Sequence, residues 1–119
     1  MTARTTLRFN STADVWAIVE QWAVENAYRR MTPEGNVRSY EKGDGLLVAP
    51  MMLKVWHENQ DTYLEAWVSI NSLIRFVSFG TMPPEIGIES GGIKAVLPRN
   101  IARAAVNQLL ARLGQGQIA

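Results

Sequence analysis

His57, Glu58 and Asp61 have the clearest potential for chemistry in this 119-residue chain, because an imidazole beside carboxylates can act as a general base. His57 is the only histidine, and the chain has no cysteine. Thiol catalysis, disulfides, iron–sulfur clusters and polyhistidine metal sites within one chain are therefore excluded. No nucleophile or glycine-rich oxyanion loop lies near the three residues in the sequence. We interpret them as a solvated turn and expect no catalytic residue, metal or cofactor.

Phosphate and nucleic-acid binding have little support. Neither Gly43-Asp44-Gly45 nor Gly91-Gly92 has the strand–glycine–helix arrangement of a phosphate loop, so both indicate turns. Arg99 and Arg103 stand one helical turn apart and are candidates for contact with an anion or an acidic partner. A solvated helix face is the alternative reading of these two arginines. The formal net charge of +1 lacks the basic balance typical of nucleic-acid-binding domains.

Length and composition indicate one globular domain. The hydrophobic content is 47% and the charged content 19%, which excludes a disordered chain. Residues 1–7 lack the apolar region of a signal peptide. The most apolar stretch, 66–79, is shorter than the roughly 20 residues that span a bilayer. We expect a single cytoplasmic domain over 1–119 that makes no membrane contact, with a frayed tail at 114–119.

Two amphipathic helices are predicted from the hydrophobic pattern. The first covers 11–26, with Ser11 and Asp14 at its start, where a hydroxyl and a carboxylate satisfy free N–H groups. The second begins at Pro98 and ends at Gly114. The apolar faces comprise Val15, Ile18, Val19 and Trp22 in the first helix and Ala102, Val106, Leu109, Leu110 and Leu113 in the second.

Alternating apolar residues predict strands in the rest of the chain. These strands lie at 5–9, 28–32, 37–41, 46–57, 62–70 and 86–88. For 73–79 we favour a further strand, and a short helix capped by Ser72 is the alternative. The fold class is therefore α+β, in the order β-α-β(n)-α. An antiparallel meander sheet of about five to seven strands has the N-terminal and C-terminal helices packed on one face.

The hairpin of 46–57 and 62–70 has two chemically different faces. If the loop 58–61 places His57 opposite Thr62, paired residue numbers sum to 119. One face is then wholly apolar and belongs under the helices; it holds Met51, Leu53, Val55, Leu64, Ala66 and Val68. The other face pairs Met52 with Trp67, Lys54 with Glu65, and Trp56 with Tyr63. Lys54 and Glu65 are expected to form a cross-strand ion pair.

This second face has more apolar side chains than a typical solvent-exposed surface, and its two charged residues are not typical of a hydrophobic core. Trp, Tyr and Met are enriched at the centres of protein interfaces. Three readings stay open: cover by the chain's own loops, such as 80–92, or by neighbouring strands; a homodimer or partner interface; or a groove for a small apolar ligand. We favour a non-catalytic, protein-binding and homodimerising module, with a small apolar-ligand carrier as the alternative.

The element order is similar to that of two known families. It resembles a reduced helix-grip fold, which implies a ligand cavity between the sheet and the last helix, lined by Val106, Leu109, Leu110 and Leu113. With a helix at 73–79, the order is similar to that of secretion-chaperone-like domains. That resemblance implies dimerisation and the binding of extended partner segments. Neither resemblance supplies catalytic residues.

Overall fold

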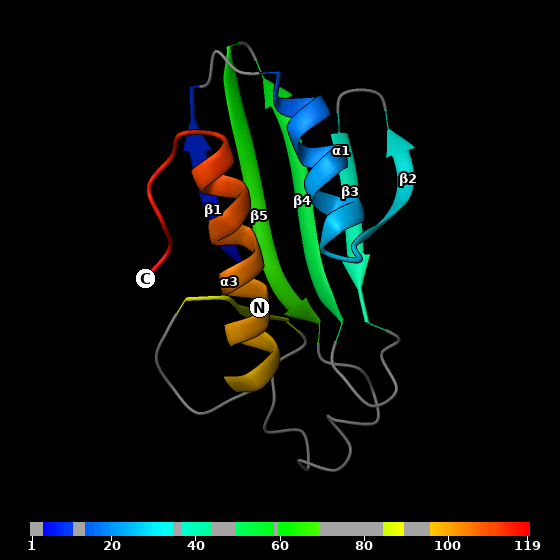
Figure 1. Cartoon of the computed structure of the whole chain (residues 1–119), viewed down its shortest axis with the longest axis vertical. Coiled ribbons are helices and arrows are strands. Elements are labelled where there is room, and N and C mark those ends of the chain that lie inside the picture. Colours follow the sequence, from blue (N-terminus) through cyan, green and yellow to red (C-terminus); the bar gives the residue numbers. More distant parts are fainter. Residues whose placement is uncertain are drawn as a thin grey trace.

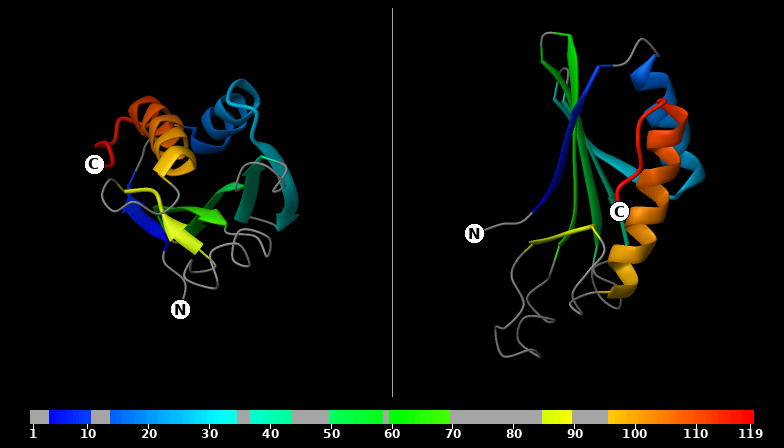
Figure 2. Two further views of the ribbon diagram at one scale, coloured as in Figure 1. Left: turned by 90° about the horizontal axis from the view of Figure 1, so that it is seen from below. Right: turned by 90° about the vertical axis from the view of Figure 1, so that its left-hand side faces the viewer.

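The computed structural model describes residues 4–10, 14–34, 37–43, 50–58, 60–69, 85–89 and 96–119. Within these ranges the chain forms a six-stranded antiparallel sheet and two helices, α1 (Val15–Glu25) and α3 (Val96–Arg112). Both helices lie on the same face of the sheet (Figures 1 and 2). We call this the inner face and the opposite side the outer face. The α+β fold predicted from the sequence is confirmed.

The strands follow the predicted segments closely. They are β1 (Thr5–Phe9), β2 (Arg29–Glu34), β3 (Val37–Lys42), β4 (Met51–Glu58), β5 (Asp61–Ser69) and β6 (Glu85–Gly87). The order across the sheet is β1-β5-β4-β3-β2. β6 pairs with the C-terminal end of β5, which extends past the residues that pair with β1. The predicted segment 73–79 lies outside the described residues, as does 46–49 of the predicted hairpin.

The β4–β5 hairpin has the predicted register. His57 lies opposite Thr62, and Lys54 lies opposite Glu65. The loop is shorter than predicted, because Glu58 and Asp61 also pair and extend the ladder by one step. This extra pair has the same register as the others. Each face of the hairpin therefore holds the residues that were assigned to it from the sequence.

The inner face of the hairpin is the floor of the hydrophobic core. Its apolar residues are all buried, together with residues of both helices, in one cluster. Every residue of the predicted apolar face of α3 belongs to this cluster. The indole Nε1 of Trp22 on α1 donates a hydrogen bond to the Ala105 carbonyl of α3 at 2.8 Å. The helices are therefore joined to each other as well as to the sheet.

The first helix begins later than predicted. α1 starts at Val15, and Asp14 is its cap rather than a first-turn residue. The Asp14 carboxylate accepts a hydrogen bond from the Ala17 N–H at 3.3 Å, which satisfies one of the free donors at the helix start. Ser11, the predicted start, lies outside the described residues.

The last helix and the tail differ from expectation in two places. α3 begins at Val96, so Pro98 lies inside the first turn, where N–H groups lack helical partners and proline is tolerated. Gly114 ends the helix as predicted, with a φ of 71°. The tail is docked rather than frayed: Asn107 bonds the Ile118 N–H at 2.6 Å and its carbonyl at 2.9 Å, and Ile118 packs against the core.

Candidate functional site

The outer face of the hairpin is the candidate site. Alternation along β4 and β5 directs every second side chain away from the helices, and six of these were predicted to bind a partner. These are the predicted binding residues Met52, Lys54, Trp56, Tyr63, Glu65 and Trp67. All are half-buried except Trp67, which is only 7% exposed. Neither described helix covers this face (Figure 2).

The aromatic side chains of the outer face are held in fixed positions. The rings of Trp56 and Tyr63 stack with centroids 5.1 Å apart and an angle of 7° between their planes. The guanidinium of Arg4 lies 3.7 Å from the centroid of the Trp67 ring. Arg8 lies above Tyr63 at 5.6 Å. Cations over aromatic faces attract them electrostatically, so these contacts order the surface before any partner arrives.

Arg4 and Arg8 are site residues that the sequence analysis missed. The pairing of β1 with β5 brings them to the outer face, with Arg8 opposite Tyr63. The available signal was the alternation of Arg4, Thr6 and Arg8 with the inward Thr5, Leu7 and Phe9. That alternation does not reveal which strand β1 joins.

The predicted ion pair between Lys54 and Glu65 is wrong. Glu65 instead binds Arg4, with Oε2 and NH1 3.0 Å apart, and Arg4 also binds Glu85 at 2.8 Å. The hydrogen bond with Glu85, followed by the one with Glu65, outweighs burial and raises the pKa of Arg4 above its usual value. Lys54 lies over Trp56, with Nζ 5.4 Å from the ring centroid, and forms no ion pair within the described ranges.

His57, Glu58 and Asp61 are strand residues rather than the solvated turn predicted from the sequence, and they do not converge on one point. His57 faces inward, where its Nδ1 lies 3.1 Å from Thr62 Oγ1 and its ring contacts Trp16 edge-on at 4.9 Å between centroids. Glu58 and Asp61 belong to the outer side of the ladder, and Asp61 pairs with Arg8 at 2.5 Å. Successive strand residues point to opposite faces, which separates the imidazole from both carboxylates.

Arg99 and Arg103 hold the end of β6 against α3. Arg99 is buried and donates to the Gly87 carbonyl at 3.1 Å and to the Glu89 carbonyl. Arg103 donates to the Ile88 carbonyl at 3.1 Å. An anion at this position would compete with backbone carbonyls for the same guanidinium groups. The predicted anion contact remains a prediction.

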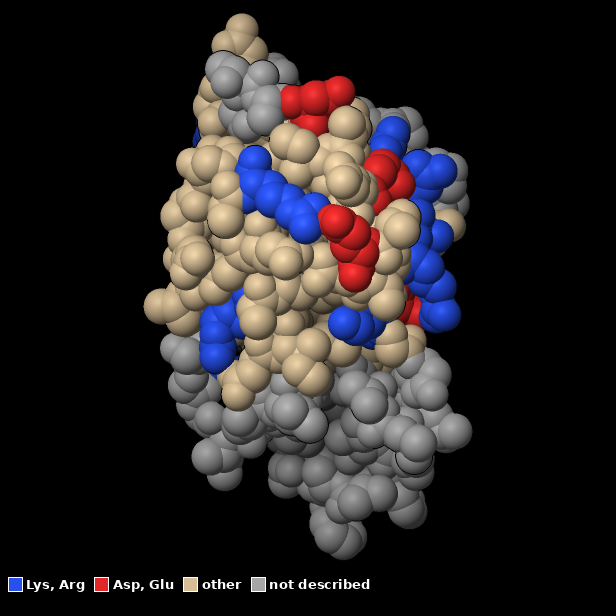
Figure 3. Space-filling model, in the orientation of Figure 1, with Lys and Arg blue, Asp and Glu red and all other residues tan. Residues whose placement is uncertain are grey.

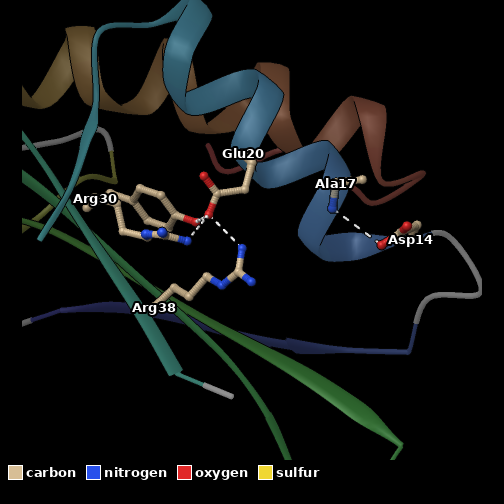
Figure 4. A network of polar contacts seen from close by, with 6 residues as sticks. Asp14, Ala17, Glu20, Arg30 and Arg38 are labelled. Atoms are coloured by element: carbon tan, nitrogen blue, oxygen red, sulfur yellow. Dashed lines mark hydrogen bonds and ion pairs between the residues drawn. The ribbon is translucent and has the colours of Figure 1, made fainter. Parts of the chain in front are cut away.

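A polar network on the inner side anchors α1 to β2 and β3 (Figure 4). Glu20 Oε1 accepts hydrogen bonds from Arg38 at 2.6 Å, from Tyr40 at 2.8 Å and from Arg30 at 3.1 Å. The Arg38 guanidinium also lies 4.5 Å from the Trp16 ring centroid. Glu20 is not part of the predicted apolar face of the helix, and the sequence analysis did not anticipate this contact. Its role is to fix the helix on the sheet.

Proton equilibria in this network are shifted in both directions. Burial acts to raise the pKa of Glu20, but the hydrogen bonds from Tyr40 and Arg38 and the nearby arginine charges together hold it below the usual 4.5. Burial, followed by the bond to Glu20, raises the pKa of Tyr40 to about 12. The native protein therefore favours an ionised Glu20 beside a neutral Tyr40.

Glu20→Gln should lower stability at neutral pH and lose this effect in acid. A carboxylate whose native pKa lies below its unfolded value contributes stability above that unfolded value, here about 4.5, and loses it as the pH falls further. Urea unfolding of both proteins across a pH series measures the difference. A gap between wild type and Glu20→Gln that stays constant from neutral to acidic pH would contradict the assignment.

The helix side of the molecule carries charges that are paired within the chain. Arg112 on α3 binds Glu25 on α1, and Arg30 shares Glu20 with Arg38. Figure 3 shows basic groups next to acidic ones on this side. These three cations already have carboxylate partners within the chain.

The residues expected to line a helix-grip cavity belong to the core. Val106, Leu109 and Leu110 are at most 1% exposed, and Leu113 is 5% exposed. They pack in the same cluster as the inner residues of β4 and β5. The described residues contain no group of three or more His, Asp or Glu side chains placed to share a metal ion. No described helix has the length and apolarity to cross a membrane.

Comparisons with known proteins add no assignment. No protein-family model matches the chain, and neither curated proteins nor solved structures give a significant match. Fold and surface chemistry are therefore the basis for a functional proposal.

Proposed function

We propose that this domain is a protein-binding module whose partner is a second copy of itself, bound through the outer face. The observation that carries the proposal is the set of outer-face aromatic and charged side chains on the side of the sheet opposite both described helices. Tryptophan, tyrosine and arginine dominate the binding energy of protein interfaces. Here they form one continuous surface on neighbouring strands.

Preorganisation of this surface favours association. The stacked Trp56 and Tyr63 and the Arg4-covered Trp67 already occupy restricted positions. A partner therefore has to immobilise few additional rotamers, and that immobilisation is a large part of the cost of binding.

Edge-to-edge association through β2 is a less favourable route to a dimer. β2 forms one edge of the sheet, and its pairing with β3 is irregular between Arg30 and Pro33. Proline lacks the N–H that a new ladder requires, and irregular edges prevent continuous pairing. Among the described residues, the outer face has no such irregularity in the pairing of β4 with β5.

Trp56→Glu should convert a dimer into a monomer without unfolding it. The substitution removes an aromatic ring from the interface and puts a charge in its place, which must be desolvated on association. Val24→Glu is the matched control, because Val24 is 80% exposed on α1, on the opposite side of the sheet. Sedimentation velocity over a concentration series, with circular dichroism to verify folding, measures the effect.

We expect wild type and Val24→Glu to sediment as dimers at concentrations where Trp56→Glu is a monomer. If wild type is a monomer at every concentration, the proposal is wrong. If Val24→Glu dissociates the dimer and Trp56→Glu does not, the interface lies on the helix side instead.

A further inference from the structure

The outer face has an unmatched charge at its centre. Four cross-strand pairs span the outer face of the hairpin, and Lys54 with Glu65 is one of the two inner pairs. Glu65 is turned toward Arg4, whereas Lys54 has no carboxylate partner within the described ranges. Other cations of this face are paired: Arg8 binds Asp61, and Arg29 binds Glu41. Burying this face against another protein would thus require a negative charge opposite Lys54.

A second copy of the chain can supply that charge in only one of two simple arrangements. When two identical sheets pack face to face, the two-fold axis lies in the plane between them. An axis across the strands at the level of Lys54 lays β4 on β4 and brings the two Lys54 side chains together. An axis along the strands, between β4 and β5, lays β4 on β5 of the other copy. Because Lys54 and Glu65 are directly opposite each other in the hairpin, this second axis places Lys54 over the partner's Glu65.

On this basis, and resting on the proposed function, we infer that the dimer axis runs parallel to β4 and β5 and that Lys54 of each copy pairs with the partner's Glu65. The same axis lays Trp56 on the partner's Tyr63 on each side of the axis, so aromatic surface meets aromatic surface there. It also lays Glu58 on the partner's Asp61, whose charge is already paired with Arg8. Stacked sheets lie about 10 Å apart, a gap that a lysine and a glutamate reaching from opposite sides span together.

The central position of this pair matters for its geometry. Packed sheets cross at about 30°, so residues far from the centre of rotation are displaced sideways. Lys54 and Glu65 flank the proposed axis near the middle of the hairpin, so they are displaced less than the pairs at its two ends. Like charges brought together at such a position oppose association, and unlike charges select the arrangement.

A charge-exchange experiment tests the axis. Lys54→Glu places two carboxylates at each central contact, and Glu65→Lys places two ammonium groups there. Each variant alone should dimerise at least about tenfold more weakly than wild type. Mixed in equal amounts, they should form a heterodimer, because both central contacts then join unlike charges. Native mass spectrometry distinguishes the heterodimer from either homodimer, and circular dichroism verifies folding.

Glu65→Lys also removes one of the two carboxylates bound to Arg4. If that variant does not fold, Glu65→Gln replaces it, since it relieves repulsion at one contact and retains attraction at the other. Glu65→Gln should still form a heterodimer with Lys54→Glu, with a smaller gain in affinity than Glu65→Lys gives. A wild type that dimerises while the mixed variants remain as weak as each alone overturns the axis and leaves the proposed function intact. A wild type that does not dimerise overturns both.

Discussion

Replacing Leu64 with glutamate is expected to unfold the domain, whereas Tyr63→Glu, one residue earlier, should leave it folded. Leu64 is fully buried, and its cross-strand neighbours are Leu7 and Val55. A carboxylate there has no polar partner in register, and burying an unpaired polar or charged group is among the few causes of very large destabilisation. The expected loss of several kcal/mol is comparable to the roughly 5–15 kcal/mol that stabilises a typical domain.

Tyr63→Glu is the matched control because it introduces the same charge into the same strand. Its side chain lies on the outer face, half-buried and near Arg8. Circular dichroism and urea unfolding of the two variants measure the contrast. A stable, folded Leu64→Glu protein beside an unfolded Tyr63→Glu protein would show that the register is off by one residue and that the two faces are exchanged.

Trp22→Ala should destabilise the domain by about 3–5 kcal/mol, the usual cost of removing a large core aromatic residue. Trp22 is fully buried and stacks at a tilt on Tyr28, with centroids 4.6 Å apart. It also holds α1 to α3 through its hydrogen bond to the Ala105 carbonyl. The substitution thus removes core volume and the direct link between the helices together. Equilibrium unfolding in urea gives the change in the free energy of unfolding.

Trp22→Phe separates these two contributions. Phenylalanine retains much of the apolar volume and loses the indole donor, so the loss should be clearly smaller than for alanine. Equal losses for the two variants would assign the whole effect to the hydrogen bond and contradict the packing account.

The hairpin could be predicted from the sequence because its two strands are adjacent in the chain and joined by a short loop. Alternation over two long segments joined by a short loop leaves one register that keeps one face wholly apolar. The pairing of β1 with β5 is not local, and Arg4 and Glu65 are 61 positions apart in the chain. The ion pair between Lys54 and Glu65 was wrong for this reason: a guanidinium from a distant strand binds the same carboxylate.

The inner polar network shows the same limit. Helical periodicity placed Glu20 on the polar side of α1, and nothing in the sequence indicated that Arg38 and Tyr40 would reach it. The pairing of Glu58 with Asp61 corrected the predicted loop of 58–61, which is shorter in the structure. Once the strand extends through His57 to Glu58, alternation alone separates these two side chains. Elements and faces follow from local patterns, whereas charged contacts between elements depend on tertiary packing.

Isotope-filtered nuclear Overhauser measurements on a mixed sample of labelled and unlabelled protein test the proposed dimer most directly, since they report only contacts between copies. We expect transfer of magnetisation from the Trp56 ring of one copy to the partner's Tyr63. Between-copy signals that arise from the α1 surface around Val24, with none from the hairpin aromatics, would contradict it.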